Sequence, residues 1–203
     1  MVTVFAGGPP AVDPLPWWDR RCGVVEPGDD VVGIRRAEDL AAAGVLSATV
    51  RHLDHWDNQY RGPTYGYREP DAGLVEAIVA DLELLLDEVD LDRWLVPLGI
   101  LHPDHRAAAT ASCAVAARHP DVEWLVYEDL PYATLYRRDR QLALDGLPSR
   151  GFGLQAVPVD LTGEASSVRE AAVRCYRSQL RGLGPEVGTA LATPERIHRL
   201  TRR

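Results

Sequence analysis

Two kinds of hydrophobic pattern alternate along this chain. Between residues 71 and 89, apolar residues recur at spacings of three and four, which predicts an amphipathic helix. Short apolar or alternating runs, typical of strands, occur at 2–6, 46–53, 94–101 and 124–130. Pro97 places the third of these runs at a sheet edge or an irregularity, because proline cannot donate to the ladder.

Capping signals add further helices. A helix is predicted over 33–43 that stops at Gly44, and another over 103–118 that begins with Pro103. Ser167 and Glu170 form a capping box that opens a helix over 168–182. The last twenty residues are basic, and we expect a short helix there, opened by Thr193 and Pro194.

The order of these elements predicts an α/β sandwich with a mostly parallel sheet, because parallel neighbours need a covering crossover helix. No repeat and no long linker divides the chain, so residues 1–203 are predicted to form a single domain. Ligands of such sheets bind where strands end and helices begin. This rule points to the junctions after residues 6, 53 and 101.

Composition narrows the class of partner. The 203 residues are 46% hydrophobic and 26% charged, with no run long enough for a membrane span and no signal peptide at the start, so we expect a cytoplasmic protein. The net charge of −8 disfavours a nucleic-acid footprint and favours a small ligand or a protein partner. The three cysteines lie far apart and signal neither a disulfide framework nor a thiolate metal site. The sequence is compatible with either a monomer or a homo-oligomer.

Candidate chemistry concentrates after residue 101. The segment His102-Pro103-Asp104-His105 follows a predicted buried strand and opens a helix, which places two imidazoles and a carboxylate at one rim of the sheet. Imidazole is a good zinc ligand, and a carboxylate beside it can set its tautomer for acid–base work. The alternative is that His102 merely caps the helix while His105 lies exposed on its first turn.

Several segments together resemble the PIG-L (LmbE-like) deacetylase family. They are LGILHPDHRAAA at 98–109, Arg35 to Glu38, HLDHWDNQYR at 52–61, YEDLPYA at 127–133 and YRSQL at 176–180. The resemblance implies a Rossmann-like three-layer α/β sandwich and a zinc-dependent hydrolase that removes acetyl groups from N-acetylglucosamine-type conjugates. It implies that His105 is a zinc ligand and that His102 polarises or protonates the tetrahedral intermediate, oriented by Asp104. It also implies that Arg35 and Asp57 lie near the sugar.

One feature of that family is missing from this sequence. The family's first motif, H-x-D-D, follows its first strand and supplies two zinc ligands and the general-base aspartate, but VTVFAGGPP at the start of this chain resembles the family's second strand. A single histidine cannot hold zinc tightly, since catalytic zinc sites generally use three protein ligands. Loss of the central first strand would also leave two inner strand edges unpaired. We expect the natural protein to begin further upstream.

Three other groups are candidates of a second rank. His52, Asp54, His55 and Asp57 could supply replacement ligands, although a loop with Asp57 facing substrate or solvent explains them as well. Glu128 and Asp129 end a predicted strand, where they line the cleft or form a solvated acidic pair. Loop aromatic residues either stack on a sugar or pack the loops; these are Trp17, Trp18, Trp56, Tyr60, Tyr65 and Tyr67.

Two function classes follow from these patterns. The first is a zinc-dependent hydrolase that deacylates an amino-sugar conjugate, a small-molecule substrate. The second is a degenerate family member that keeps a sugar-binding cleft and acts as a binding or regulatory protein. Zinc content per chain and hydrolysis of an amino sugar separate the two.

Overall fold

A computed structural model describes residues 1–9, 12–23, 29–62, 70–89, 91–159 and 163–203. The chain folds into two compact units, and each draws on two stretches of sequence. Unit 1 comprises residues 1–64 and 161–192, and unit 2 comprises 65–160 and 193–203. Each unit therefore includes a segment from the C-terminal part of the chain.

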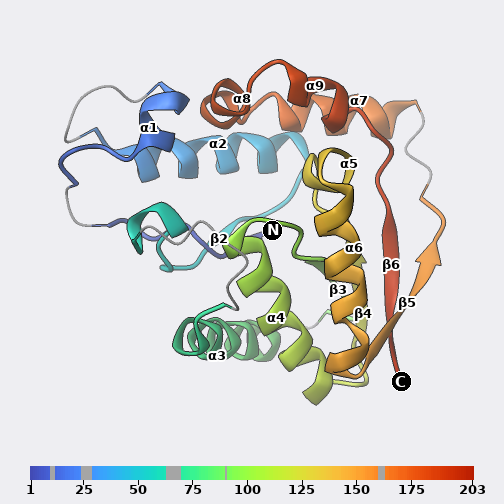
Figure 1. Ribbon diagram of the computed structural model, residues 1–203. Coiled ribbons are helices and arrows are strands. Elements are labelled where there is room, and N and C mark those ends of the chain that lie inside the picture. The colour runs from blue at the N-terminus through green and yellow to red at the C-terminus, as the bar shows by residue number, and fades with distance from the viewer. Residues whose placement is uncertain (10–11, 24–28, 63–69, 90, 160–162) are drawn as a thin grey trace. The chain divides into compact units, whose positions relative to one another are not determined.

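Unit 1 is built around one long helix. Strands β1 (Val2–Thr3) and β2 (Arg51–His52) pair in parallel, and helix α2 (Val31–Val45) connects them in sequence. Helix α1 (Trp17–Cys22) packs on α8 (Arg177–Leu183), and α2 packs on α7 (Glu164–Val173). Helix α9 (Glu186–Leu191) follows α8, and the short 3₁₀ helix η1 (Asn58–Tyr60) follows β2. Figure 1 shows α1, α7, α8 and α9 along one side of α2.

Unit 2 contains the larger sheet, with strand order β3-β4-β6-β5. Strands β3 (Arg93–Pro97) and β4 (Glu123–Tyr127) are parallel, whereas β5 (Phe152–Val157) and β6 (Ile197–Arg202) run antiparallel to each other, and β6 is antiparallel to β4. Helices α3 (Ala72–Glu88) and α4 (Pro103–Arg118) pack on each other, and α4 also packs on β3 (Figure 1). The remaining elements are α5 (Tyr132–Leu135), α6 (Arg137–Gly146) and the 3₁₀ helix η2 (Pro148–Arg150).

Local signals place the long helices where the sequence predicts them. Asp71 caps α3 because its carboxylate accepts a hydrogen bond from the backbone N–H of Leu74 at 2.9 Å. Helix α4 begins at Pro103 as predicted and is rich in alanine, and its buried small side chains let neighbouring elements approach closely. Helix α2 runs two residues beyond the predicted end, because its chain reverses at Ser47, which has a φ of 52°, rather than at Gly44.

Other predictions are wrong. The predicted helix over 168–182 is two helices, α7 and α8, and Ser167 lies inside α7, where its hydroxyl donates to the carbonyl of Gly163 instead of capping. The basic C-terminal segment forms strand β6 rather than a helix, because its backbone pairs with both β4 and β5. The larger sheet is consequently mixed, which confirms an α/β fold but only partly the expected parallel arrangement.

The described strands form two sheets rather than one. Within the described residues, β1 pairs only with β2, apart from an isolated bridge between Phe5 and Asp54, and β3 pairs only with β4. Pro97 thus lies on an edge strand, as its missing N–H predicts. The division into one or more domains, and the expected additional strand, stay predictions.

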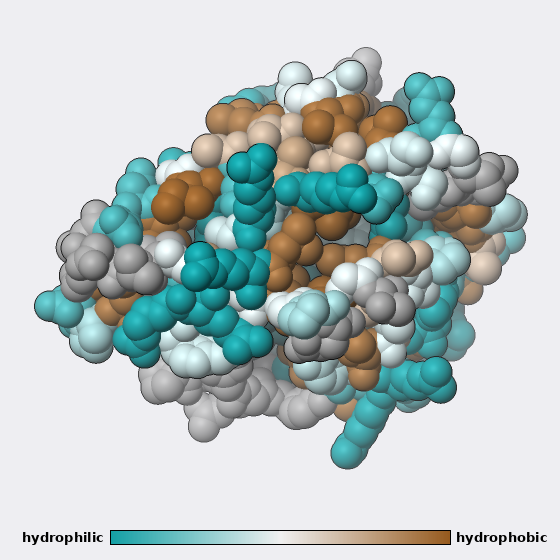
Figure 2. Space-filling model, turned by 90° about the horizontal axis from the view of Figure 1, so that it is seen from above, coloured by the Kyte–Doolittle hydropathy of each residue, from teal (hydrophilic) through white to brown (hydrophobic). Residues whose placement is uncertain are grey.

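The surface is mixed in character. In the space-filling view from above, apolar side chains form separate clusters with polar side chains between them (Figure 2). Folded proteins normally expose a large share of apolar surface, so these clusters do not by themselves mark a site. Among the described residues, no helix is both long and apolar enough to cross a membrane.

Candidate functional site

The two histidines of the HPDH segment lie together in unit 2. The chain leaves β3, passes Gly99 with a φ of 85° and Leu101 with a φ of 63°, and enters α4 at His102. A Cβ at Gly99 would lie 2.7 Å from the Cβ of Ala109, so only glycine lets this loop pack against α4. Leu101 holds a left-handed backbone that costs about 1–3 kcal/mol, and such strain clusters at functional sites.

His102 is the N-cap of α4. Its Nδ1 accepts a hydrogen bond from the backbone N–H of Asp104 at 3.3 Å, and the carboxylate of Asp104 lies 3.9 Å from the same nitrogen. The carboxylate is therefore at ion-pair distance, whereas the backbone makes the hydrogen bond. His102 therefore caps the helix and at the same time lies beside the carboxylate of Asp104.

His105 lies one turn into the same helix, and its ring centroid is 5.3 Å from that of His102. Its Nδ1 lies 2.7 Å from Oδ1 of Asp129, which follows β4 by two residues and is 1% exposed. Tyr132, at the start of α5, places its ring edge-on to His105 at 5.3 Å and stacked on His102 at 6.4 Å. His102 and His105 are thus neighbours because they are close in the sequence, whereas the fold brings the buried carboxylate of Asp129 and the phenol ring of Tyr132 to them.

Glu128 and Asp129 are not the solvated pair that was one interpretation of the sequence. Both carboxylates are 1% exposed, and they point to different partners. Glu128 accepts hydrogen bonds from Arg140 at 2.6 and 2.7 Å and from Arg196 at 2.9 Å, and lies 3.0 Å from Nε2 of His198. Burial acts to raise the pKa of Glu128, but hydrogen bonds from Arg140 and His198 outweigh it and hold the pKa below its usual value.

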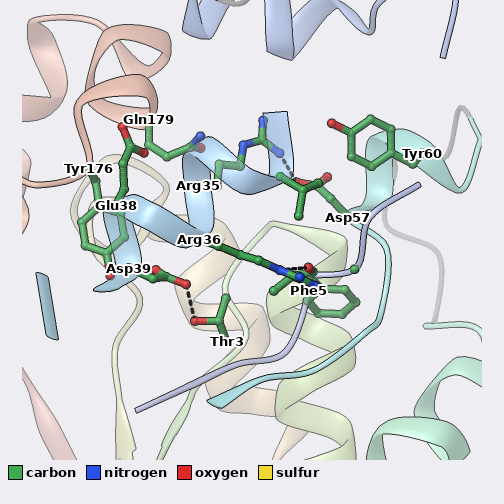
Figure 3. Close-up of a pocket in the computed structure, with 13 residues that line it drawn as sticks. Thr3, Phe5, Arg35, Arg36, Glu38, Asp39, Asp57, Tyr60, Tyr176 and Gln179 are labelled. Carbon is green, nitrogen blue, oxygen red and sulfur yellow. Dashed lines mark hydrogen bonds and ion pairs between the residues drawn. The ribbon is translucent and has the colours of Figure 1, made fainter. Parts of the chain in front are cut away.

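A cavity of about 180 Å³ lies within unit 1. Residues from β1, α2, η1 and α8 line it, and Figure 3 shows their side chains converging from these elements. Arg35 and Asp57 face each other across one part of the cavity, with NH1 of Arg35 3.3 Å from Oδ2 of Asp57. The structure therefore brings together the two residues that the family resemblance places near a sugar.

Asp19 anchors this pair, although sequence reasoning missed it. Its carboxylate is fully buried and accepts hydrogen bonds from Arg35 at 2.7 Å, Gln59 at 3.0 Å and Tyr60 at 2.7 Å. Burial alone would lower the pKa of Arg35, but Asp57 and Asp19 raise it above its ordinary value. Burial and the hydrogen bond to Asp19 raise the pKa of Tyr60. Arg35 is consequently a fixed cation at the cavity wall.

A second polar cluster lines another part of the same cavity. The carboxylate of Asp39 accepts a hydrogen bond from the hydroxyl of Thr3 at 2.7 Å and lies 3.0 Å from Nε2 of His52 (Figure 3 shows Thr3 and Asp39). Glu38 accepts two hydrogen bonds, both 2.7 Å long, from the backbone N–H and hydroxyl of Ser178. These contacts join α2 to β1, β2 and α8.

The residues of His52 to Asp57 do not converge on one point. His52 faces Asp39 and Asp57 faces Arg35, while the side chain of Asp54 is largely exposed. Among the described residues, no group of three or more histidine, cysteine or acidic side chains is arranged to hold a metal. His105 is a single imidazole whose Nδ1 already contacts Asp129, whereas zinc needs about three protein ligands. The described residues therefore do not fit a complete zinc site.

The aromatic residues have mixed outcomes. Tyr60 lines the cavity, whereas Trp17 and Trp18 belong to helix α1 rather than to a loop. Tyr65 and Tyr67 lie outside the described residues. Asp129 is a second-rank candidate that the structure places against His105. Tyr132, which also packs on His105, has no sequence signal beyond its place in the YEDLPYA segment.

The chain is similar over nearly its whole length to several deacetylases of known structure. The A40926 pseudoaglycone deacetylase is 30% identical, with a TM-score of 0.79 over 99% of this chain and 84% of the other. A complex of a deacetylase with teicoplanin is 26% identical, with a TM-score of 0.77 over 100% of this chain and 86% of the other. A zinc-inhibited form of teicoplanin deacetylase is 27% identical, with a TM-score of 0.78 over 100% and 86%. No sequence-family description and no curated protein sequence matches this chain.

Proposed function

This chain belongs to the family of the A40926 pseudoaglycone deacetylase, and from that membership we propose that it is an amide hydrolase that removes an acyl group from the amino sugar of a glycopeptide-type conjugate. The observation that carries the proposal is the fold match over 99–100% of the chain to proteins that are themselves deacetylases. Fold alone does not establish function, so specific residues of this chain must also be able to carry out the reaction.

The HPDH segment is the proposed reaction site. His102 would carry the proton that the leaving amine nitrogen needs when the tetrahedral intermediate collapses, and Asp104 at 3.9 Å would stabilise the protonated imidazole. His105 supplies a second imidazole nitrogen at the same rim. The strained backbone at Leu101 supports this assignment, because the fold holds these side chains in place at an energetic cost.

The cavity of unit 1 is the proposed sugar site. Arg35 offers donors and Asp57 offers acceptors, which is the combination that hydroxyl and amide groups of an amino sugar require. The hydrogen bond to Asp19 already restricts the side chain of Arg35, so Arg35 would lose little conformational entropy when a sugar binds.

We also propose that the hydrolysis depends on zinc. The support is the family resemblance, together with the existence of a zinc-inhibited form of a similar deacetylase. His105 would be one ligand. Because the described residues supply no second and third ligand, we assign no chemical step to the metal.

The test is deacylation of an N-acylglucosaminyl glycopeptide, such as teicoplanin, followed by mass spectrometry, with zinc content measured on the same preparation. We expect hydrolysis, and we expect His102→Ala to lower turnover by about 10²–10⁴-fold, the usual range for a general acid–base residue. His119→Ala is the matched control, because this histidine ends the same helix and contacts Glu83 instead.

Two outcomes would count against the proposal. Equal turnover in His102→Ala and the wild type would remove His102 from the reaction. A chain that hydrolyses nothing, with or without added zinc, yet is stabilised by amino sugars in a thermal-shift assay would instead be a sugar-binding or regulatory member of the family.

A further inference from the structure

Asp129 has no role in the function described so far, yet it is among the most buried charged residues of unit 2. Its Oδ2 accepts hydrogen bonds from the backbone N–H groups of Gly99 at 2.9 Å and Ile100 at 3.2 Å. Its Oδ1 lies 2.7 Å from Nδ1 of His105. One carboxylate therefore connects the segment after β4 to the loop after β3 and to the first turn of α4.

These contacts decide where the proton of His105 lies. A carboxylate can only accept hydrogen bonds, so the short contact to Nδ1 requires an N–H on that nitrogen. In the neutral ring, Nε2 then carries a lone pair. The two backbone donors on Oδ2 prevent the carboxylate from rotating away, so the ring orientation is set together with the tautomer.

His102 has the opposite arrangement. Its Nδ1 accepts the backbone N–H of Asp104, so in the neutral ring the proton lies on Nε2. The two rings, 5.3 Å apart, thus differ: His102 carries a donor on Nε2, and His105 carries an acceptor there.

We propose that Asp129 is a positioning residue that fixes His105 as its Nδ1–H tautomer, opposite to that of His102, so that the lone pair of the neutral His105 ring lies on Nε2. This role rests on the proposed function for its catalytic meaning, but the tautomers are a property of the folded chain alone. Tyr132 supports the same arrangement, since its ring contacts both imidazoles.

The test is heteronuclear NMR of the imidazole nitrogens in isotope-labelled wild type, recorded as the pH is raised until the nitrogen shifts of both rings are those of neutral imidazole. Chemical shifts distinguish protonated from unprotonated ring nitrogens, and variants that lack one histidine assign the signals. We expect His105 to be protonated on Nδ1 and His102 on Nε2. A wild-type His105 protonated on Nε2 would overturn the proposal without any variant.

Asp129→Asn gives a second, independent readout. The amide oxygen can still accept the N–H groups of Gly99 and Ile100, while its NH₂ now faces His105 and donates to Nδ1. We expect His105 to switch to the Nε2–H tautomer and His102 to stay unchanged. Where the wild type is active, kcat should fall by about 10–100-fold, the usual effect of removing such a partner, with little change in KM.

Glu128→Gln is the matched control, because Glu128 is an adjacent carboxylate of equal burial that contacts Arg140, Arg196 and His198 rather than His105. It should leave both tautomers in place. If His105 keeps its Nδ1 proton in Asp129→Asn, the proposal is wrong. An inactive wild type with the expected tautomers would instead refute the deacylase function and leave the role of Asp129 standing.

Discussion

The buried carboxylate of Asp19 allows a stability prediction to be worked from the structure. Replacing Asp19 by alanine leaves three donors without their acceptor, namely the guanidinium of Arg35, the amide of Gln59 and the hydroxyl of Tyr60. Removing one member of a buried ion pair costs about 3–5 kcal/mol, because the remaining charge is left uncompensated. Arg35 keeps Asp57 at 3.3 Å, which holds the loss within that range rather than above it.

The isosteric variant separates charge from shape. In Asp19→Asn, the amide oxygen can still accept from Arg35 and Gln59, and the NH₂ can donate to the oxygen of Tyr60. Only the charge is lost, so the cost should be about 1–2 kcal/mol, the difference between hydrogen bonds with and without an ionised partner. The stability loss of Asp19→Asn measures the contribution of the charge. The additional loss in Asp19→Ala measures the contribution of the hydrogen bonds that the amide preserves.

Urea denaturation followed by far-ultraviolet circular dichroism measures both values. With a slope of about 2 kcal/mol per molar urea, the midpoint should fall by about 1.5–2.5 M in Asp19→Ala and by less than half of that in Asp19→Asn. The control is Glu123→Ala, which also removes a carboxylate that contacts two arginines, Arg93 and Arg199, but one whose side chain is 25% exposed. Equal midpoint shifts in Asp19→Ala and Glu123→Ala would refute the argument that burial makes the Asp19 network valuable.

Two further predictions concern unit 2. Because the pKa of Glu128 is lowered in the folded state, its ionisation stabilises the fold above the ordinary glutamate pKa of about 4.3 and ceases to do so as the pH falls through the lowered value. The difference in unfolding free energy between wild type and Glu128→Gln should therefore shrink below about pH 4, and a constant difference across denaturation curves from pH 7 to 3 would contradict this. Asp71→Ala removes the N-cap of α3 and should cost about 1 kcal/mol, measured as a shift in the urea midpoint, whereas Asp71→Ser, which preserves a capping oxygen, should restore most of it.

Local features of this fold could be predicted from the sequence because their interactions are local. Helices α3 and α4 satisfy their hydrogen bonds within four residues, and Asp71 and Pro103 mark where they begin. His102 and His105 are three residues apart at a helix start, so their proximity follows from helix geometry once the helix is identified.

Contacts across long sequence separations escaped prediction. The basic segment from Ile197 to Arg202 carries no strong strand pattern, and it becomes a strand because β4 and β5 offer it backbone partners on both sides. The predicted helix over 168–182 is interrupted for a similar reason, since Ser178 of α8 is bound by Glu38, which is 140 residues away in the sequence. Propensity is a weak prior when tertiary partners of this kind compete with it.

The chain alone determined which groups are available for chemistry: two imidazoles and a carboxylate at one helix start, an arginine near a helix start, and a family likeness that names their roles. Tertiary structure alone decided how those groups are held. It buried Asp129 against His105 and Asp19 against Arg35, pairs that are 24 and 16 residues apart in sequence. The physical reason is that an imidazole's tautomer and a guanidinium's orientation depend on partners within hydrogen-bond distance, and only the folded chain brings such partners together.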